Sequence, residues 1–275
     1  MNYDNEHRKH LLAYLQQIER LFYQWVGFSV SLALKTDFKE LIASTLFAFS
    51  KTKKGKAFEK ELANFSNQLD QIIKQGISNE WAFANLKQDH LLREGLTKYQ
   101  NLEALETFKN RKIKDFTVSD RVWDIAKKAQ TEIELALSVS LEEGKSAVQL
   151  SREVRNLLNN PTALFRRVRD KYGNLVLSKN AQNYHPGQGV YRSAYKNALR
   201  LASNEINVAY KSADWLRIQQ NPDVVGFEVR LSPQHKVYDM CDELKGKYPK
   251  SFHFHGWHVG CKCHIVTILK TDEEL

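Results

Sequence analysis

The spacing of apolar residues along the first 110 positions predicts a set of helices. Apolar side chains recur every three or four residues from Leu11 to Trp25, which places them on one face of a helix. The same pattern returns over Phe38–Phe49 and Phe58–Ile77, and the lysine-rich segment Lys51–Lys56 separates these two stretches. Because such stripes normally form the buried face of a helix, we assign them to a core and not to a cofactor site.

A second helical block is predicted after Lys114. Its first buried stripe runs from Val122 to Leu137 with helical spacing. Ser146 and Gln149 have the spacing of a capping box, so a new helix should begin there. A longer helix is expected over about Val190–Gln219, where tyrosine, leucine, isoleucine and many alanines repeat at three- and four-residue intervals.

The pattern changes to strict alternation after Pro222, and this change predicts a strand. The apolar positions there, which should face a core, are Val225, Phe227, Val229 and Leu231. A second strand is expected over Ile265–Leu269, directly after a cysteine-rich turn. The predicted fold is therefore mostly α-helical with a small C-terminal α+β module, in which a long helix precedes a short β-sheet closed by a Cys/His turn.

Composition agrees with a helical globular chain. Of the 275 residues, 42% are hydrophobic and 27% charged, and only five prolines and twelve glycines interrupt them. No stretch approaches the roughly 20 apolar residues that a membrane span needs. The first residues lack the charged and then apolar order of a secretion signal, so we expect a protein that is not exported through one.

The net charge of +9 allows contact with a polyanion, although a solvated basic surface explains it equally well. The chain is most basic between positions 150 and 180. The candidate contacts for nucleic acid in that segment are Arg166, Arg167, Arg169 and Lys171.

Thiols and imidazoles gather near the end of the chain. All three cysteines and five of the nine histidines lie between positions 235 and 264. An odd number of cysteines argues against a disulfide framework and for reduced thiols. Zinc takes four such ligands, and the candidates are Cys241, His258, Cys261 and Cys263.

The spacing of Cys261 and Cys263 leaves two interpretations open. Residues two apart on a regular strand point to opposite faces, so both thiolates reach one ion only if the backbone turns sharply. Gly260 permits such a turn. In the other interpretation the cysteines are small buried apolar groups and His258 is a hydrogen-bonded loop anchor.

An enzyme is the weaker prediction for this cluster. A Cys–His nucleophile pair would need Cys241 beside His258, and no oxyanion site accompanies them in the sequence. The alternative is a zinc-dependent hydrolase or nuclease acting on nucleic acid, with Asp239, Asp242 and His258 near the metal. The same two carboxylates flank the expected start of a helix, where they would serve equally well as caps.

Several short motifs resemble the phage head morphogenesis family, the Mu F-like minor head proteins. The matching pieces before an apolar strand are Asp239-Met-Cys-Asp242, Leu244-Lys-Gly246, Trp257-His258 and Cys261-Lys-Cys263. Val259 stands where the family has proline, and Lys262 replaces an arginine. On the preceding helix, Arg200 and Glu205 match the ends of a polar pattern of the family.

The resemblance covers about residues 115–270. Further upstream, Leu164–Leu177 and His185–Arg192 look like the version of this protein in Bacteroidetes prophages. The resemblance implies a helical N-terminal region over 1–113 and a head morphogenesis domain over 114–275, helical to about 220 with the α+β module at 221–275.

The resemblance also implies a structural role without enzymatic activity. Such proteins are minor components of the phage head, associate with the portal, and contribute to head assembly and DNA packaging or delivery. The expected location is the virion, and the host cytoplasm during assembly. Its implied partners are the portal, other head proteins and packaged DNA, with the segment from Arg166 to Lys171 as the contact. Polar ties from Arg200, Glu205, Asp239 and Asp242 would support a Cys/His clasp that could carry zinc.

Overall fold

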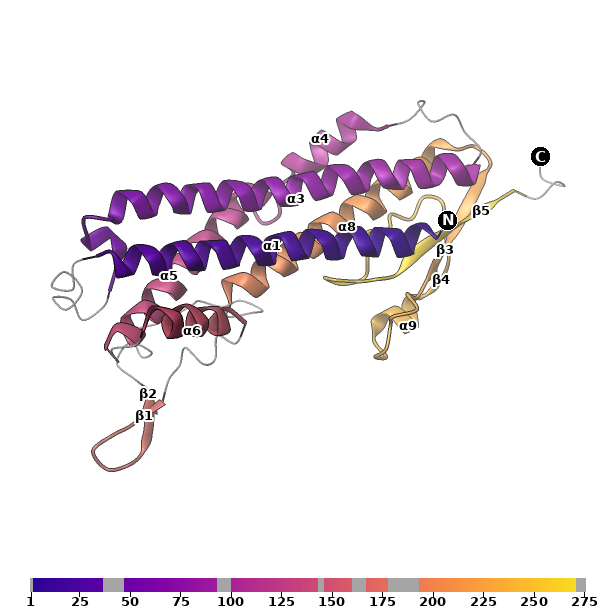
Figure 1. Ribbon diagram of the computed structural model, residues 1–275. Coiled ribbons are helices and arrows are strands. Elements are labelled where there is room, and N and C mark those ends of the chain that lie inside the picture. The colour runs from indigo at the N-terminus through magenta and orange to yellow at the C-terminus, as the bar shows by residue number, and fades with distance from the viewer. Residues whose placement is uncertain are drawn as a thin grey trace. The chain divides into compact units, whose positions relative to one another are not determined.

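The computed structural model describes residues 2–36, 47–92, 100–142, 146–159, 167–177 and 193–270 (Figure 1). The elements in chain order are α1 (Tyr3–Leu34), η1 (Phe49–Lys51), α3 (Gly55–Leu92), α4 (Leu102–Asn110), α5 (Val118–Glu142), α6 (Ala147–Asn159), β1 (Arg167–Arg169), β2 (Leu175–Leu177), α8 (Ala194–Gln220), β3 (Val224–Arg230), α9 (Met240–Leu244), β4 (Gly246–Pro249) and β5 (His264–Leu269). The predicted fold class is confirmed: a mostly helical region ends in the long helix α8, and a three-stranded antiparallel sheet follows beside the Cys/His cluster.

The chain folds as two compact units, each built from separate segments. Unit 1 comprises Met1–Leu15, Ile72–Thr117 and Arg200–Leu275, and unit 2 comprises Gln16–Gln71 and Val118–Leu199. The long helices α1, α3 and α8 therefore contribute residues to both units. The division of the chain after residue 113, which the resemblance implies, stays a prediction.

Unit 2 is a helical body with an aromatic core. Phe22 and Trp25 of α1 pack on Phe65 of α3, with ring centroids 4.9 and 5.1 Å apart. All three side chains are at most 2% exposed, as expected for the buried face of an amphipathic helix. The predicted stretch Phe38–Phe49 lies outside the described residues up to position 46, and Phe49 begins the 3-10 helix η1.

Two further helix predictions are confirmed in unit 2. The stripe from Val122 to Leu137 forms the buried face of α5. At the start of α6, Ser146 and Gln149 make the reciprocal hydrogen bonds of a capping box, at 3.2 and 3.4 Å. Even the longest helices that the structure describes are too polar for a segment that crosses a bilayer.

In unit 1, a small sheet packs against the end of α8. Its strand order is β4–β3–β5, with both neighbours antiparallel to the central strand β3. Phe227 and Val229 of β3, Ile265 of β5 and Ile218 of α8 share one buried cluster with all three cysteines. The three thiols are therefore part of the core of this module, whereas His258 is exposed at its edge.

The predicted orientation of Val225 is wrong. Its side chain is 45% exposed, whereas Val224 is 3% exposed and takes the place in the core. The register of β3 against β5 shifts between Val224 and Gly226, which turns Val225 outward. A Cβ at Gly226 would lie 2.6 Å from the Tyr248 carbonyl oxygen, so only glycine allows β4 to approach this closely.

Candidate metal centre

Two segments of unit 1 bring the Cys/His site together. Cys241 lies in α9, whereas His258 and Cys261 lie in the loop between β4 and β5. The Cys241 sulfur is 3.2 Å from His258 Nε2 and 3.8 Å from the Cys261 sulfur. All three ligand atoms lie within 4.8 Å of one another. These residues could therefore hold a metal ion such as zinc, with Cys263 nearby.

A capping box fixes the position of Cys241. Asp239 precedes α9, and its Oδ1 accepts a hydrogen bond from the Cys241 amide at 2.7 Å. Asp242 Oδ2 accepts from the Asp239 amide at 3.0 Å and also lies 2.7 Å from His235 Nε2. These interactions lower the pKa of both carboxyl groups, chiefly through the Cys241 amide at Asp239 and the Asp239 amide at Asp242. Both acids thus hold the short helix that presents the first thiol.

Two glycines with positive φ shape the loop that carries the other ligands. Gly256 has φ of 111° and Gly260 of 79°, a region that favours glycine. A Cβ at Gly256 would lie 3.2 Å from Cys261 Cβ, so the loop folds back closely on itself. The expected sharp turn at Gly260 is present, and Cys261 and Cys263 are only 1% and 3% exposed. Both thiols therefore enter one core despite their spacing.

Helix α8 supports the loop from within unit 1. Lys211 Nζ and Asn207 Nδ2 both donate to the Cys261 carbonyl oxygen, at 2.6 and 2.7 Å. The Lys211 side chain is buried, and burial lowers the pKa of its ammonium group while the charges of the cysteines act in the opposite direction. A buried cation is costly unless an anion compensates it, so this lysine favours negative charge on the sulfur cluster.

The three thiols differ in their pKa values. A hydrogen bond from Cys263, with help from the Lys211 ammonium, lowers the pKa of Cys261 to about 4. Burial raises the pKa of Cys241 to about 12. The pKa of Cys263 is raised because its thiol donates to Cys261 and is itself buried. Cys261 is therefore the thiol that carries the negative charge of the cluster. Binding of a metal cation would have to displace the protons that remain on Cys241 and Cys263.

The orientation of His258 suits metal ligation. Its Nδ1 lies 3.0 Å from the Val259 carbonyl oxygen. A proton on Nδ1 donates to that carbonyl and leaves the Nε2 lone pair facing Cys241. Asp239 Oδ2 is 3.4 Å from the same Nε2, so a carboxylate oxygen also borders the site.

The other predicted polar residues lie apart from the thiols. Glu205 is fully buried on α8, and its carboxylate pairs with Arg111 Nη2 at 2.5 Å. Arg200 is half-buried at the start of the α8 segment that belongs to unit 1. A tie between this helix and the sheet through Arg200 stays a prediction.

The predicted basic contact belongs to unit 2. Arg166 lies outside the described residues. Arg167 and Arg169 are the ends of β1, which pairs with β2 in an antiparallel hairpin. Lys171 is exposed in the turn between these strands. A role of this segment in binding DNA or a portal stays a prediction.

Sequence reasoning missed the contribution of α8 to the site. Lys211 and Asn207 stand about 50 positions before Cys261, and on an amphipathic helix they look like ordinary polar residues. A comparison with protein-family models, with curated proteins and with solved structures finds no match for this chain.

Proposed function

We propose that this chain is a minor head protein of a phage or prophage, acting structurally and without catalysis in head assembly and in DNA packaging or delivery. Its partners would be the portal and other head proteins, and its place the virion after assembly in the host cytoplasm. The observation that supports this proposal is the meeting of Cys241, His258 and Cys261. They belong to the motifs that resemble the Mu F-like proteins, and they come from two separate segments.

The site's role in this proposal is a zinc clasp. Cys241, His258, Cys261 and Cys263 would be the four ligands, a closed protein set that is typical of structural zinc. Such a clasp joins α9 to the segment that enters β5, across 20 positions between Cys241 and Cys261. Three thiolates and a neutral imidazole around Zn²⁺ leave a charge of about −1, which the buried Lys211 ammonium offsets.

One distance favours the alternative of a zinc-dependent hydrolase or nuclease. Asp239 Oδ2 lies 3.4 Å from His258 Nε2, so a carboxylate stands where it could contact a metal-bound water. The other oxygen of Asp239 and the carboxylate of Asp242 take part in the capping box of α9. Those hydrogen bonds explain both acids without catalysis, and we therefore prefer the structural role.

The structural role is tested in particles. Mass spectrometry of virions purified after induction of a lysogen that carries this gene should find the chain at low copy number. A Cys241→Ser/Cys261→Ser variant should yield fewer DNA-filled heads. Absence of the chain from intact particles would contradict the proposal.

The zinc clasp is tested on purified protein. Elemental analysis should find about one zinc per chain, and thiol titration should find the cysteines protected until a chelator is added. Three freely reactive thiols without zinc would refute the clasp and support a packing role. Cleavage of DNA with Zn²⁺, Mg²⁺ or Mn²⁺ that is lost in His258→Ala would instead establish the enzymatic alternative.

A further inference from the structure

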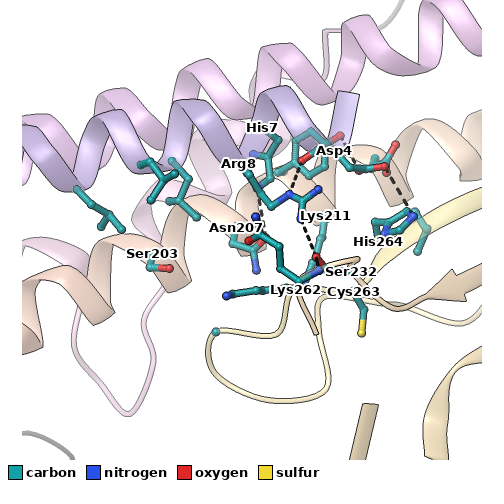
Figure 2. Close-up of a pocket in the computed structure, with 18 residues that line it drawn as sticks. Asp4, His7, Arg8, Ser203, Asn207, Lys211, Ser232, Lys262, Cys263 and His264 are labelled. Carbon is teal, nitrogen blue, oxygen red and sulfur yellow. Dashed lines mark hydrogen bonds and ion pairs between the residues drawn. The ribbon is translucent and has the colours of Figure 1, made fainter. Parts of the chain in front are cut away.

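A cavity of about 220 Å³ lies in unit 1 next to the loop that carries the thiols (Figure 2). Its walls come from the first turns of α1, the middle of α8, the loop after β3 and the segment that enters β5. Cys263 contributes to the wall, but Figure 2 shows its sulfur pointing away from the labelled groups of α1. The cavity therefore adjoins the candidate metal centre and shares Cys263, Lys211 and Asn207 with its surroundings.

The two carboxylates of the cavity are already held by donors. Asp214 accepts from Lys87 Nζ at 2.7 Å. Asp4 accepts from the Tyr210 hydroxyl at 3.2 Å and lies 3.8 Å from the same lysine. Lys87 and Tyr210 therefore already pair with these two acids.

The cations of the cavity are placed differently. The Arg8 guanidinium donates to three uncharged oxygens: the Asp4 carbonyl, the Asn5 side chain and the Ser232 hydroxyl. These bonds orient the guanidinium at the cavity wall without neutralising it (Figure 2). Lys262 lines the same cavity and is exposed to solvent. The cavity thus presents two cationic side chains, and the guanidinium of Arg8 is held in place by its hydrogen bonds.

An apolar strip lies beside this charge. Leu11, Leu12 and Leu15 line the cavity and follow Arg8 at intervals of three, four and seven residues, so all four share one face of α1. Leu12 is 60% exposed, although a leucine on the face of a packed helix is normally covered. The cavity therefore changes from a cationic end to an apolar end along α1.

We propose that this cavity binds a small amphipathic carboxylate. Its carboxylate would lie between Arg8 and Lys262, and its apolar tail would lie on the strip of Leu11, Leu12 and Leu15. Pockets that combine an apolar wall with a few oriented polar groups are the usual form of small-molecule sites. This site goes beyond the head-protein role and does not depend on the metal.

The test is a titration of the full-length protein, as purified, with four probes. Octanoate has both the carboxylate and the apolar tail, octanol has only the tail, and acetate has only the carboxylate. Inorganic phosphate is an anion of a different kind without a tail. Leucine-methyl and arginine Nε NMR signals report where each probe binds. We expect octanoate to shift the signals of Arg8, Leu11 and Leu15, and to bind at least about tenfold more tightly than the other three probes.

Variants on α1 assign the contacts. Arg8→Met should weaken octanoate binding about tenfold or more, whereas Arg8→Lys should retain part of it. Leu12→Gln alters an exposed side chain, so it should leave folding intact and weaken octanoate but not acetate. Lys9→Met is the matched control, because Lys9 is exposed and pairs with Glu6 outside the cavity.

Three results would overturn the proposal. Equal affinity for octanol and octanoate would mean that the cations do not contribute. Phosphate binding as tightly as octanoate would mean that the apolar strip does not contribute. Unchanged octanoate affinity in Arg8→Met, with an intact amide spectrum, would place the carboxylate elsewhere.

Discussion

Removal of Asp214 should destabilise the unit that holds the metal centre. Its Oδ2 lies 2.7 Å from Lys87 Nζ, and the two side chains are only 2% and 5% exposed. Lys87 also donates to the Ile265 carbonyl at 3.4 Å, so this contact joins α3, α8 and β5 within unit 1. Strand β5 follows directly after Cys263, and therefore the ion pair supports the scaffold of the candidate metal centre.

The geometry sets the expected magnitude. At 2.7 Å the attraction is about 6 kcal/mol for an effective dielectric constant of about 20, before the cost of desolvation. Removing one partner of a buried pair typically costs about 3–5 kcal/mol, because an uncompensated charge remains. We expect Asp214→Asn near the lower end, since Asp4 lies 3.8 Å from the orphaned Lys87 ammonium. The double variant Lys87→Met/Asp214→Leu should be more stable than Lys87→Met alone or Asp214→Leu alone.

The dependence of this contribution on pH follows from Lys87. Burial alone would lower the pKa of its ammonium group, but the charges of Asp214 and Asp4 outweigh burial and raise it. A raised lysine pKa contributes stability that is complete below the unfolded value of about 10.4 and is lost as pH rises through the folded pKa. The contribution of Lys87 should therefore be fully present at neutral pH, whereas burial raises the pKa of Asp214 and works against the pair at that pH.

Urea denaturation at pH 7, followed by circular dichroism, measures these differences. Lys9→Met is the control, because its exposed pair with Glu6 should contribute less than about 1 kcal/mol. If each single variant lost less than about 1 kcal/mol of unfolding free energy, the idea of a buried, coupled ion pair would be refuted. Strictly additive losses in the double variant would refute it as well.

Three further predictions concern the metal centre and the sheet. His258→Ala should weaken zinc binding by at least about tenfold in competition with a chelator, because one ligand is lost; equal affinity would exclude His258 from the ligand set. Asp239 and Asp242 have lowered pKa values, so they contribute stability that is present above the ordinary pKa of about 3.9 and is lost as pH falls through their lower folded values. Asp239→Asn should therefore weaken the fall of the thermal unfolding temperature at acidic pH. An unchanged dependence on acidic pH would contradict the capping role. Gly226→Ala should destabilise the sheet by about 1–3 kcal/mol in urea denaturation, since its Cβ would lie 2.6 Å from a backbone oxygen, whereas Gly27→Ala on α1, with open space around it, should stabilise slightly.

The sequence predicts best where a local pattern decides the structure. The stripes on α1, α5 and α8 repeat at helical spacing, and most of the corresponding side chains are buried, although Leu12 at the start of the α1 stripe is 60% exposed. Alternation predicts β3 correctly at Phe227 and Val229 but not at Val225. The register shift that turns Val225 outward adjoins the close approach of Gly226 to Tyr248, a contact with another strand. Periodicity within one segment carries no information about such a contact.

Residue type predicts that Cys241, His258 and Cys261 gather in one site, but it does not predict the geometry of that site. Cys261 and Cys263 reach the same core because Gly256 and Gly260 turn the loop at positive φ. Gly260 stands directly before the cysteine pair, so its role can be predicted from the sequence. Gly256 is farther away, and its role becomes apparent only from the structure, in which a Cβ at this position would lie close to Lys211 and Cys261. A turn of this kind depends on contacts from α8, which no spacing within the loop encodes.

Lys211 gives an argument for the charge of the cluster that does not depend on the cysteine motif. Its side chain is only 3% exposed, and its ammonium donates to the Cys261 carbonyl, an uncharged acceptor. Burial lowers the pKa of this ammonium group, and the charges that act in the opposite direction are those of Cys261, Cys263 and Cys241. If all three thiols were neutral, α8 would bury a cation without compensation, which costs several kcal/mol. Protonated Lys211 therefore favours an anionic sulfur cluster, and thiolates are the form in which cysteines bind zinc.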